Sequence, residues 1–108
     1  SLVECSAPYA HQELLCAEGL GLCEPGDGWK LFEDGVTEIE GPLPFNPSGG
    51  VLGANPYIAR GLIRVAEAAL QLTSKAGAHQ VKGATTALAH GTYGLAGQAH
   101  SVVVLGKE

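Results

Sequence analysis

The clearest pattern of hydrophobic and polar positions runs from Tyr57 to about Ala76. Polar residues recur there every three or four positions, which predicts one narrow stripe along a helix: Arg60, Arg64, Glu67, Gln71 and Lys75. Apolar side chains occupy the rest of the circumference, so we expect this helix to pack between layers rather than on a single sheet. Pro56 suits the first turn of the helix, and Gly77 is placed to end it as a C-cap.

Shorter apolar runs predict three strands. The first is LVECS near the N-terminus, the second runs from Ala84 to Ala89, and the third runs from Ser101 to Leu105. The third contains VVVL, a continuous apolar run that is typical of a strand covered on both faces. The last two strands are joined by the glycine-rich segment HGTYGLAGQAH.

The segments between these elements are less regular. Pro8 can open a helix that continues to about Gly19, and a Gly/Pro-rich break, GLGLCEPGDG, follows. Residues 29–37 fit either a short helical turn or a strand. Residues 41–56 carry four prolines, so we expect no regular structure there.

Composition limits the classes of protein to consider. The chain has 108 residues, of which 45% are hydrophobic, and it contains no run long enough to span a membrane. It begins without a secretion leader, and we therefore expect a cytoplasmic location. Its three cysteines are odd in number and lack CxxC spacing, which is typical of free or buried thiols in a reducing compartment. His11, His79 and His100 show no metal-ligand spacing, so no metal site is predicted.

Charge is unevenly distributed along the chain. The net charge is −5, which argues against a nucleic acid partner, and nine of the eleven acidic residues precede Gly41. Five of the six Lys and Arg residues follow Gly41. This asymmetry fits either an anionic ligand near the second half or a solvated acidic surface on the first half. We expect neither a nucleic acid nor a membrane as a partner.

The predicted elements are too few to form a stable domain by themselves. Three or four strands and a helix that needs cover on most of its sides bury too little apolar surface by themselves. We therefore expect the chain to be part of a larger protein or assembly.

A loop of unusual composition precedes the long helix. NPSGGVLGANPYIARG, residues 46–61, contains two Asn-Pro steps and a Gly-Gly pair. Such a loop can hold backbone amides and short side chains against a ligand, which makes Ser48, Gly49 and Gly50 candidate substrate-binding residues. The alternative is that they only shape the loop.

This loop and its flanks carry a resemblance to a known family. NPSGG and the following residues resemble the thiolase superfamily signature NPSGGxxxxGHPxGATG, and EGLGLCEPGDG resembles the family block EALGLCPEGQG. The order of strand, block, loop, helix and strand–turn–strand also matches. The whole length, residues 1–108, is similar to the C-terminal half of the second thiolase domain, closest to the branch of sterol-carrier-protein thiolases and thiolase-like steroid side-chain aldolases.

The resemblance implies a layered α/β fold, with a mixed sheet and a buried long helix. It also implies an acyl-CoA thioester as substrate and no cofactor. The nucleophilic Cys of such thiolases would lie in an N-terminal half outside this chain. By the same resemblance we expect a homodimer, and the aldolase-like relatives work with a small partner that has an OB-fold and a zinc ribbon.

Carried over residue by residue, the resemblance marks candidate site residues. Ala54-Asn55-Pro56 falls on Gly-His-Pro, so Asn55 replaces the catalytic His. Ser6 falls on the Asn or His of a second oxyanion-site motif, and Tyr9 on its aromatic position. The glycine-rich segment between the last two strands falls on the family's terminal turn. His90 falls on the His that precedes this turn, and the backbone amide of Gly94 or Gly97 would bind an oxyanion. Tyr57 directly follows the Asn-Pro step.

The replacement of His by Asn55 restricts the chemistry. A carboxamide donates and accepts hydrogen bonds but does not titrate, so Asn55 can stabilise an enolate but cannot activate a Cys nucleophile. We therefore favour carbon–carbon lyase chemistry, namely retro-aldol cleavage of a β-hydroxyacyl-CoA such as a steroid side-chain thioester. Tyr57, Tyr9 and His90 are the candidate acid–base residues.

Several alternatives stay open at this stage. Asn55 can cap the helix that begins at Pro56, the two tyrosines can be packing residues, and His90 can be structural. For the whole protein, the alternatives are an acyltransferase or thiolase with an atypical base, and a non-catalytic subunit that binds acyl-CoA or lipid.

Overall fold

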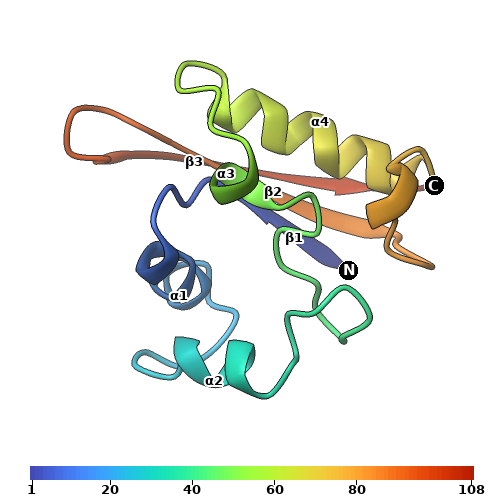
Figure 1. Ribbon diagram of the computed structural model, residues 1–108, viewed down its shortest axis with the longest axis horizontal. Coiled ribbons are helices and arrows are strands. Elements are labelled where there is room, and N and C mark those ends of the chain that lie inside the picture. Colours follow the sequence, from blue (N-terminus) through green and yellow to red (C-terminus); the bar gives the residue numbers. More distant parts are fainter.

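The computed structural model describes residues 1–108, which form a three-stranded mixed sheet with helices on both faces (Figure 1). The strands are β1 (Leu2–Cys5), β2 (Thr86–Tyr93) and β3 (Ala99–Gly106), in the order β1-β2-β3. β1 and β2 are parallel, whereas β2 and β3 form an antiparallel hairpin. The register places Cys5 opposite His90 and His90 opposite Val102.

The sheet separates two layers of helices. α4 (Arg60–Leu72) lies along one face, and α1 (Ala10–Gly19) and α2 (Gly28–Glu33) lie on the other side (Figure 1). Two short elements complete the fold, namely α3 (Gly50–Gly53) and a 3₁₀ turn, η1 (Gly77–His79). The α/β class and the mixed sheet predicted from the sequence are therefore confirmed.

Because side chains alternate across a strand, β1 contributes to a core on each face. Leu2 packs with Ala68 and Leu72 of α4. Val3 and Cys5 pack on the opposite face, with Ala17 of α1 and with apolar side chains that follow it: Leu20, Leu22, Cys23, Leu31, Phe32 and Phe45. The predicted apolar cover from the first helix is confirmed by the buried Ala17, although this helix begins at Ala10 rather than Pro8.

Two glycines allow α4 to approach β2. A Cβ atom built on Gly91 would lie 3.0 Å from the Cα atom of Gly61, and one built on Gly61 would lie 3.3 Å from the Cα of Gly91. Both distances are tighter than nine in ten real Cβ contacts, so a side chain at either position would require the helix and the sheet to move apart by a few tenths of an ångström.

Several predicted boundaries were wrong. α4 begins at Arg60 and ends at Leu72, so Pro56 lies outside its first turn and Gly77 begins η1 instead of capping the helix. α3 lies within the proline-rich segment that was expected to be irregular. Of the two alternatives left open for residues 29–37, the helical one is observed, since α2 covers Gly28–Glu33. Both strands of the hairpin extend further into the glycine-rich segment than predicted.

The outer side of α4 and most of β3 remain uncovered. Leu62 is 73% exposed, whereas Arg64 and Gln71 of the polar stripe are buried against the sheet. Val104 in β3 is 66% exposed, and Val102 is also exposed, so the prediction that this strand is covered on both faces is wrong within this chain. No helix is both long and apolar enough to cross a membrane.

Candidate functional site

The predicted site residues gather at one end of the sheet. Ser6 directly follows β1, and His90 lies opposite Cys5 in β2. The turn between β2 and β3 and the N-terminal end of α4 lie at this same end (Figure 1). The carboxyl ends of parallel strands are the usual ligand-binding edge of α/β sheets, so this placement fits a binding site.

The loop before α4 places Asn55 and Tyr57 in solvent. Tyr57 is 75% exposed and has a backbone φ of +27°, a strained value for an aromatic residue. The Arg60 guanidinium lies 5.3 Å from the centre of the Tyr57 ring, and its Nε donates a 3.2 Å hydrogen bond to the Tyr57 carbonyl. Ala59, not Asn55, is the N-cap of α4, so the capping role considered for Asn55 is wrong.

Ser6 and Tyr9 follow β1 in different environments. Ser6 is buried, its N–H donates a 3.0 Å hydrogen bond to the His90 carbonyl, and its Oγ has no hydrogen-bond partner. An unpartnered buried hydroxyl is costly, which marks Ser6 as a residue with capacity for a further contact. Tyr9 is exposed and stacks on His11, with ring centres 5.8 Å apart.

Gly94 and Gly97 form the tip of the β2–β3 hairpin. Both have positive φ angles, +105° and +63°, which glycine adopts readily. The N–H of Gly97 donates a 3.1 Å hydrogen bond to the carbonyl of Gly94. The Gly97 amide is therefore engaged within the turn.

Ser48 belongs to a hydrogen-bonded network beneath the loop. Its Oγ donates to Glu4 Oε2 over 2.7 Å and accepts from Arg64 Nη1 over 2.8 Å, and Glu4 also forms a 2.8 Å ion pair with Arg64. Burial raises the pKa of Glu4, against the opposing effects of the Ser48 hydrogen bond and the Arg64 charge. This network connects β1, α4 and the loop that carries the positive-φ residues Gly49 and Gly50.

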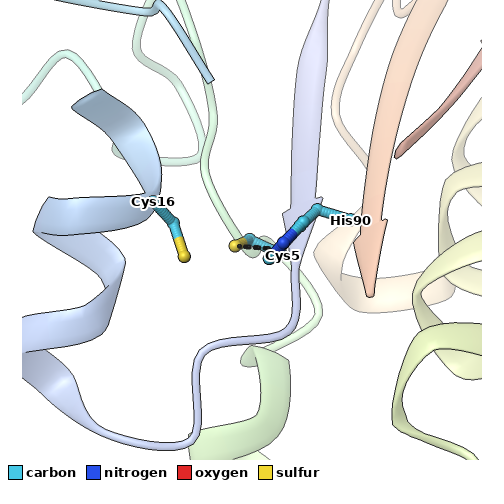
Figure 2. Close-up of side chains that lie close together, drawn as sticks. All are labelled: Cys5, Cys16 and His90. Atoms are coloured by element: carbon cyan, nitrogen blue, oxygen red, sulfur yellow. Dashed lines mark hydrogen bonds between the residues drawn. The ribbon is translucent and has the colours of Figure 1, made fainter. Parts of the chain in front are cut away.

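A second network surrounds Cys5. Its Sγ lies 3.1 Å from His90 Nδ1, and His90 Nε2 lies 3.1 Å from His100 Nδ1. Cys16 of α1 points toward the Cys5 sulfur (Figure 2). The pKa of Cys16 is lowered to about 5, chiefly by a hydrogen bond with Cys5 and also by His90 and His100, against the opposing effect of burial. The hydrogen bond with Cys16 and burial raise the pKa of Cys5.

The structure thus divides the predicted residues into two groups. His90 is buried and bonded to Cys5, whereas Asn55, Tyr57 and Tyr9 are exposed and share no hydrogen bond with it. Sequence reasoning missed Cys5 and Cys16 because they are separated by ten residues and lie on different elements. No signal in the sequence marks them, because the register that places Cys5 next to His90 is visible only in the folded chain.

Comparisons with known proteins agree with this fold. Residues 1–107 match the family described as "Thiolase C-terminal domain-like". An acetyl-CoA acetyltransferase of Methanothermobacter thermautotrophicus is 40% identical over 99 residues, which cover 91% of this chain and 26% of that protein. Sterol carrier protein 2 of Rattus norvegicus is also 40% identical over 99 residues, which cover 91% of this chain and 18% of that protein.

A more distant relative is the benzoylsuccinyl-CoA thiolase subunit BbsB of Thauera aromatica, which is 32% identical over 83 residues, or 76% of this chain and 22% of that protein. The chain spans about a quarter or less of the length of these relatives. The resemblance of the NPSGG loop and its flanks to thiolases is confirmed, and the chain belongs to the thiolase C-terminal domain-like family.

Proposed function

We propose that this chain is part of an acyl-CoA-handling protein that cleaves a carbon–carbon bond in a β-hydroxyacyl-CoA. The names of two relatives, acetyl-CoA acetyltransferase and benzoylsuccinyl-CoA thiolase subunit, support a CoA thioester as the class of substrate. Asn55 in place of the family's His supports a reaction that needs no His-activated Cys.

The observation that carries the proposal is the conformation of Tyr57. A bulky residue held at φ +27° and 75% exposed costs stability without contributing to a core. Strain of this kind clusters at active sites, and Tyr57 lies at the carboxyl end of the sheet two residues after Asn55.

In the proposed reaction, Tyr57 as its phenolate removes the proton of the substrate β-hydroxyl. The Cα–Cβ bond then breaks, Cβ becomes a ketone, and the electron pair moves onto the thioester as an enolate. Asn55 stabilises that enolate by donating a hydrogen bond from its amide. Reprotonation of the α-carbon gives a shortened acyl-CoA and restores the phenolate, so the reaction is balanced without free CoA or a redox partner.

The test uses the complete protein, with any partner subunit encoded beside it. It is incubated with a β-hydroxyacyl-CoA that bears a tertiary hydroxyl, and CoA species are followed by mass spectrometry. We expect a shortened acyl-CoA and a ketone, without consumption of free CoA. Tyr57→Phe should lower the rate about 10²- to 10⁴-fold and Asn55→Ala about 10²- to 10³-fold.

Tyr93→Phe is the matched control, since Tyr93 is also an exposed tyrosine but lies within β2. Cleavage that requires free CoA would instead favour an acyltransferase, an alternative that the acetyltransferase relative supports. Binding of acyl-CoA with no turnover, unaffected by either substitution, would favour a non-catalytic subunit.

A further inference from the structure

Three potential metal ligands from three different elements meet beneath the sheet end. Cys5 lies in β1, Cys16 in α1 and His90 in β2, and their Sγ, Sγ and Nδ1 atoms all lie within 4.8 Å of one another. Figure 2 shows the Cys5 sulfur between the Cys16 sulfur and the His90 ring. The fold, rather than any local sequence spacing, therefore creates this cluster.

We propose that Cys5, Cys16 and His90 bind a thiophilic divalent cation of the zinc type. Two thiolates and an imidazole are a donor set that favours zinc over the oxygen-preferring cations. Tetrahedral zinc separates such donors by about 3.5–3.8 Å, given its bond lengths of about 2.0–2.3 Å. Cys5 Sγ and His90 Nδ1 are 3.1 Å apart, and no two of the three ligand atoms are more than 4.8 Å apart. The side chains therefore need to shift by about 1 Å or less to reach tetrahedral zinc geometry.

The surroundings of the cluster orient its ligands. His90 Nε2 lies 3.1 Å from His100 Nδ1, so an Nε2–H that donates to His100 leaves the Nδ1 lone pair directed at the cluster. The Cys5 N–H donates a 2.6 Å hydrogen bond to Asn46 Oδ1, and the Asn46 amide donates to Glu13 Oε1 over 2.6 Å. These bonds hold β1, the NPSGG loop and α1 around the cluster.

The burial of the three side chains indicates on which side a bound ion would be open to a further ligand. Cys5 and His90 are buried, whereas Cys16 is half-buried at the surface of α1. With three protein ligands, the fourth position of a tetrahedral ion is left for water or a small ligand on the Cys16 side. Each thiol releases its proton to solvent as the ion binds. Cys5 Sγ and His90 Nδ1, which are hydrogen-bonded to each other without the ion, would then both be bound to it.

The proposal is independent of the proposed lyase reaction. An ion at this site would hold His90 as a ligand and leave proton transfer to Tyr57 and Tyr9. Metal binding can be measured without substrate, so failure of one proposal does not decide the other.

The test is a titration of the reduced, metal-free complete protein with Co²⁺ and then Zn²⁺. We expect thiolate-to-Co²⁺ charge-transfer absorption that Zn²⁺ abolishes. After gel filtration, elemental analysis should give one more Zn²⁺ per chain for the unmodified protein than for Cys16→Ser. Ions bound elsewhere in the complete protein or by a partner subunit contribute equally to both proteins, so they cancel in this difference.

Cys16→Ser is chosen because Cys16 is half-buried, so the fold should survive the substitution; circular dichroism checks this. Cys23→Ser is the matched control, since Cys23 is a half-buried thiol outside the cluster, and it should bind as the unmodified protein does. His100→Ala should weaken binding about 10- to 100-fold, as expected for a residue that orients a ligand.

Equal Zn²⁺ content in Cys16→Ser and the unmodified protein would overturn the proposal. A Cys5–Cys16 disulfide that persists in the presence of reductant would also overturn it.

Discussion

Arg64 and Glu4 illustrate how single residues depend on tertiary contacts. Both side chains are almost fully buried, and their 2.8 Å ion pair joins α4 to β1. From the sequence, Arg64 is one member of a polar helical stripe, with nothing to indicate that it faces the sheet. Its carboxylate partner lies 60 residues earlier, so only the folded chain reveals the pair.

We predict that Arg64→Met destabilises the protein by about 3–5 kcal/mol, because it leaves the buried Glu4 carboxylate without its counter-charge. Urea unfolding measures the free energy of unfolding. The double variant Glu4→Gln/Arg64→Met should be more stable than Arg64→Met, since no charge is then buried. Lys75→Met removes an exposed charge and should change stability by less than about 0.5 kcal/mol. Equal losses in the single and double variants would contradict the explanation.

A second prediction at this scale concerns Tyr57. Tyr57→Gly should raise the free energy of unfolding by about 1 kcal/mol, because glycine tolerates a positive φ without strain. The same substitution should abolish the proposed cleavage. Tyr93→Gly, within β2, should instead lower stability, because glycine weakens a strand. A loss of stability in Tyr57→Gly equal to that in Tyr93→Gly would show that Tyr57 is not strained.

At the scale of elements, the contact between α4 and β2 decides how the site is assembled. The hydrophobic period predicted the helix and both hairpin strands, because side-chain periodicity is local information. It could not predict the close approach of Gly61 and Gly91, which are 30 residues apart in sequence. The helix start was also misplaced, because the Asn55-Pro56 step is followed by a turn rather than by the helix itself.

We predict that Gly91→Ala destabilises the protein by about 1–3 kcal/mol, because the added Cβ would lie 3.0 Å from the Cα of Gly61, and α4 and β2 would have to separate by a few tenths of an ångström. Thermal or urea unfolding provides the measurement. Gly106→Ala in β3 is the control: a Cβ atom there meets nothing within 4 Å, so stability should not fall. Equal effects of the two substitutions would mean that the helix–sheet spacing does not depend on Gly91.

At the scale of the whole molecule, the chain has two uncovered apolar surfaces. One is the outer side of α4, with Leu62 and Leu70, and the other is β3, with Val102 and Val104. The chain spans about a quarter or less of its relatives' length, so we expect the remainder of a thiolase-like fold to cover the outer side of α4. Contiguous apolar surface of this kind usually marks an interface.

We predict that Leu62→Glu makes the separately produced chain less prone to aggregate but prevents correct assembly of the complete protein. Light scattering measures the first effect, and gel filtration and proteolysis measure the second. Thr73→Glu adds the same charge at an exposed polar position just beyond α4 and should change neither. Normal assembly of the Leu62→Glu protein would show that the outer side of α4 is not an interface.

The sequence by itself determined the α/β class, the long helix, the NPSGG loop and the family, because periodicity and motifs are local properties. It also identified Asn55 in place of the family's His, a replacement that removes the titratable group from that one position. Only the tertiary structure decided which polar side chains are buried and that Cys5, Cys16 and His90 meet. These contacts join positions up to 85 residues apart, and strand register and helix packing, rather than local spacing, bring them together.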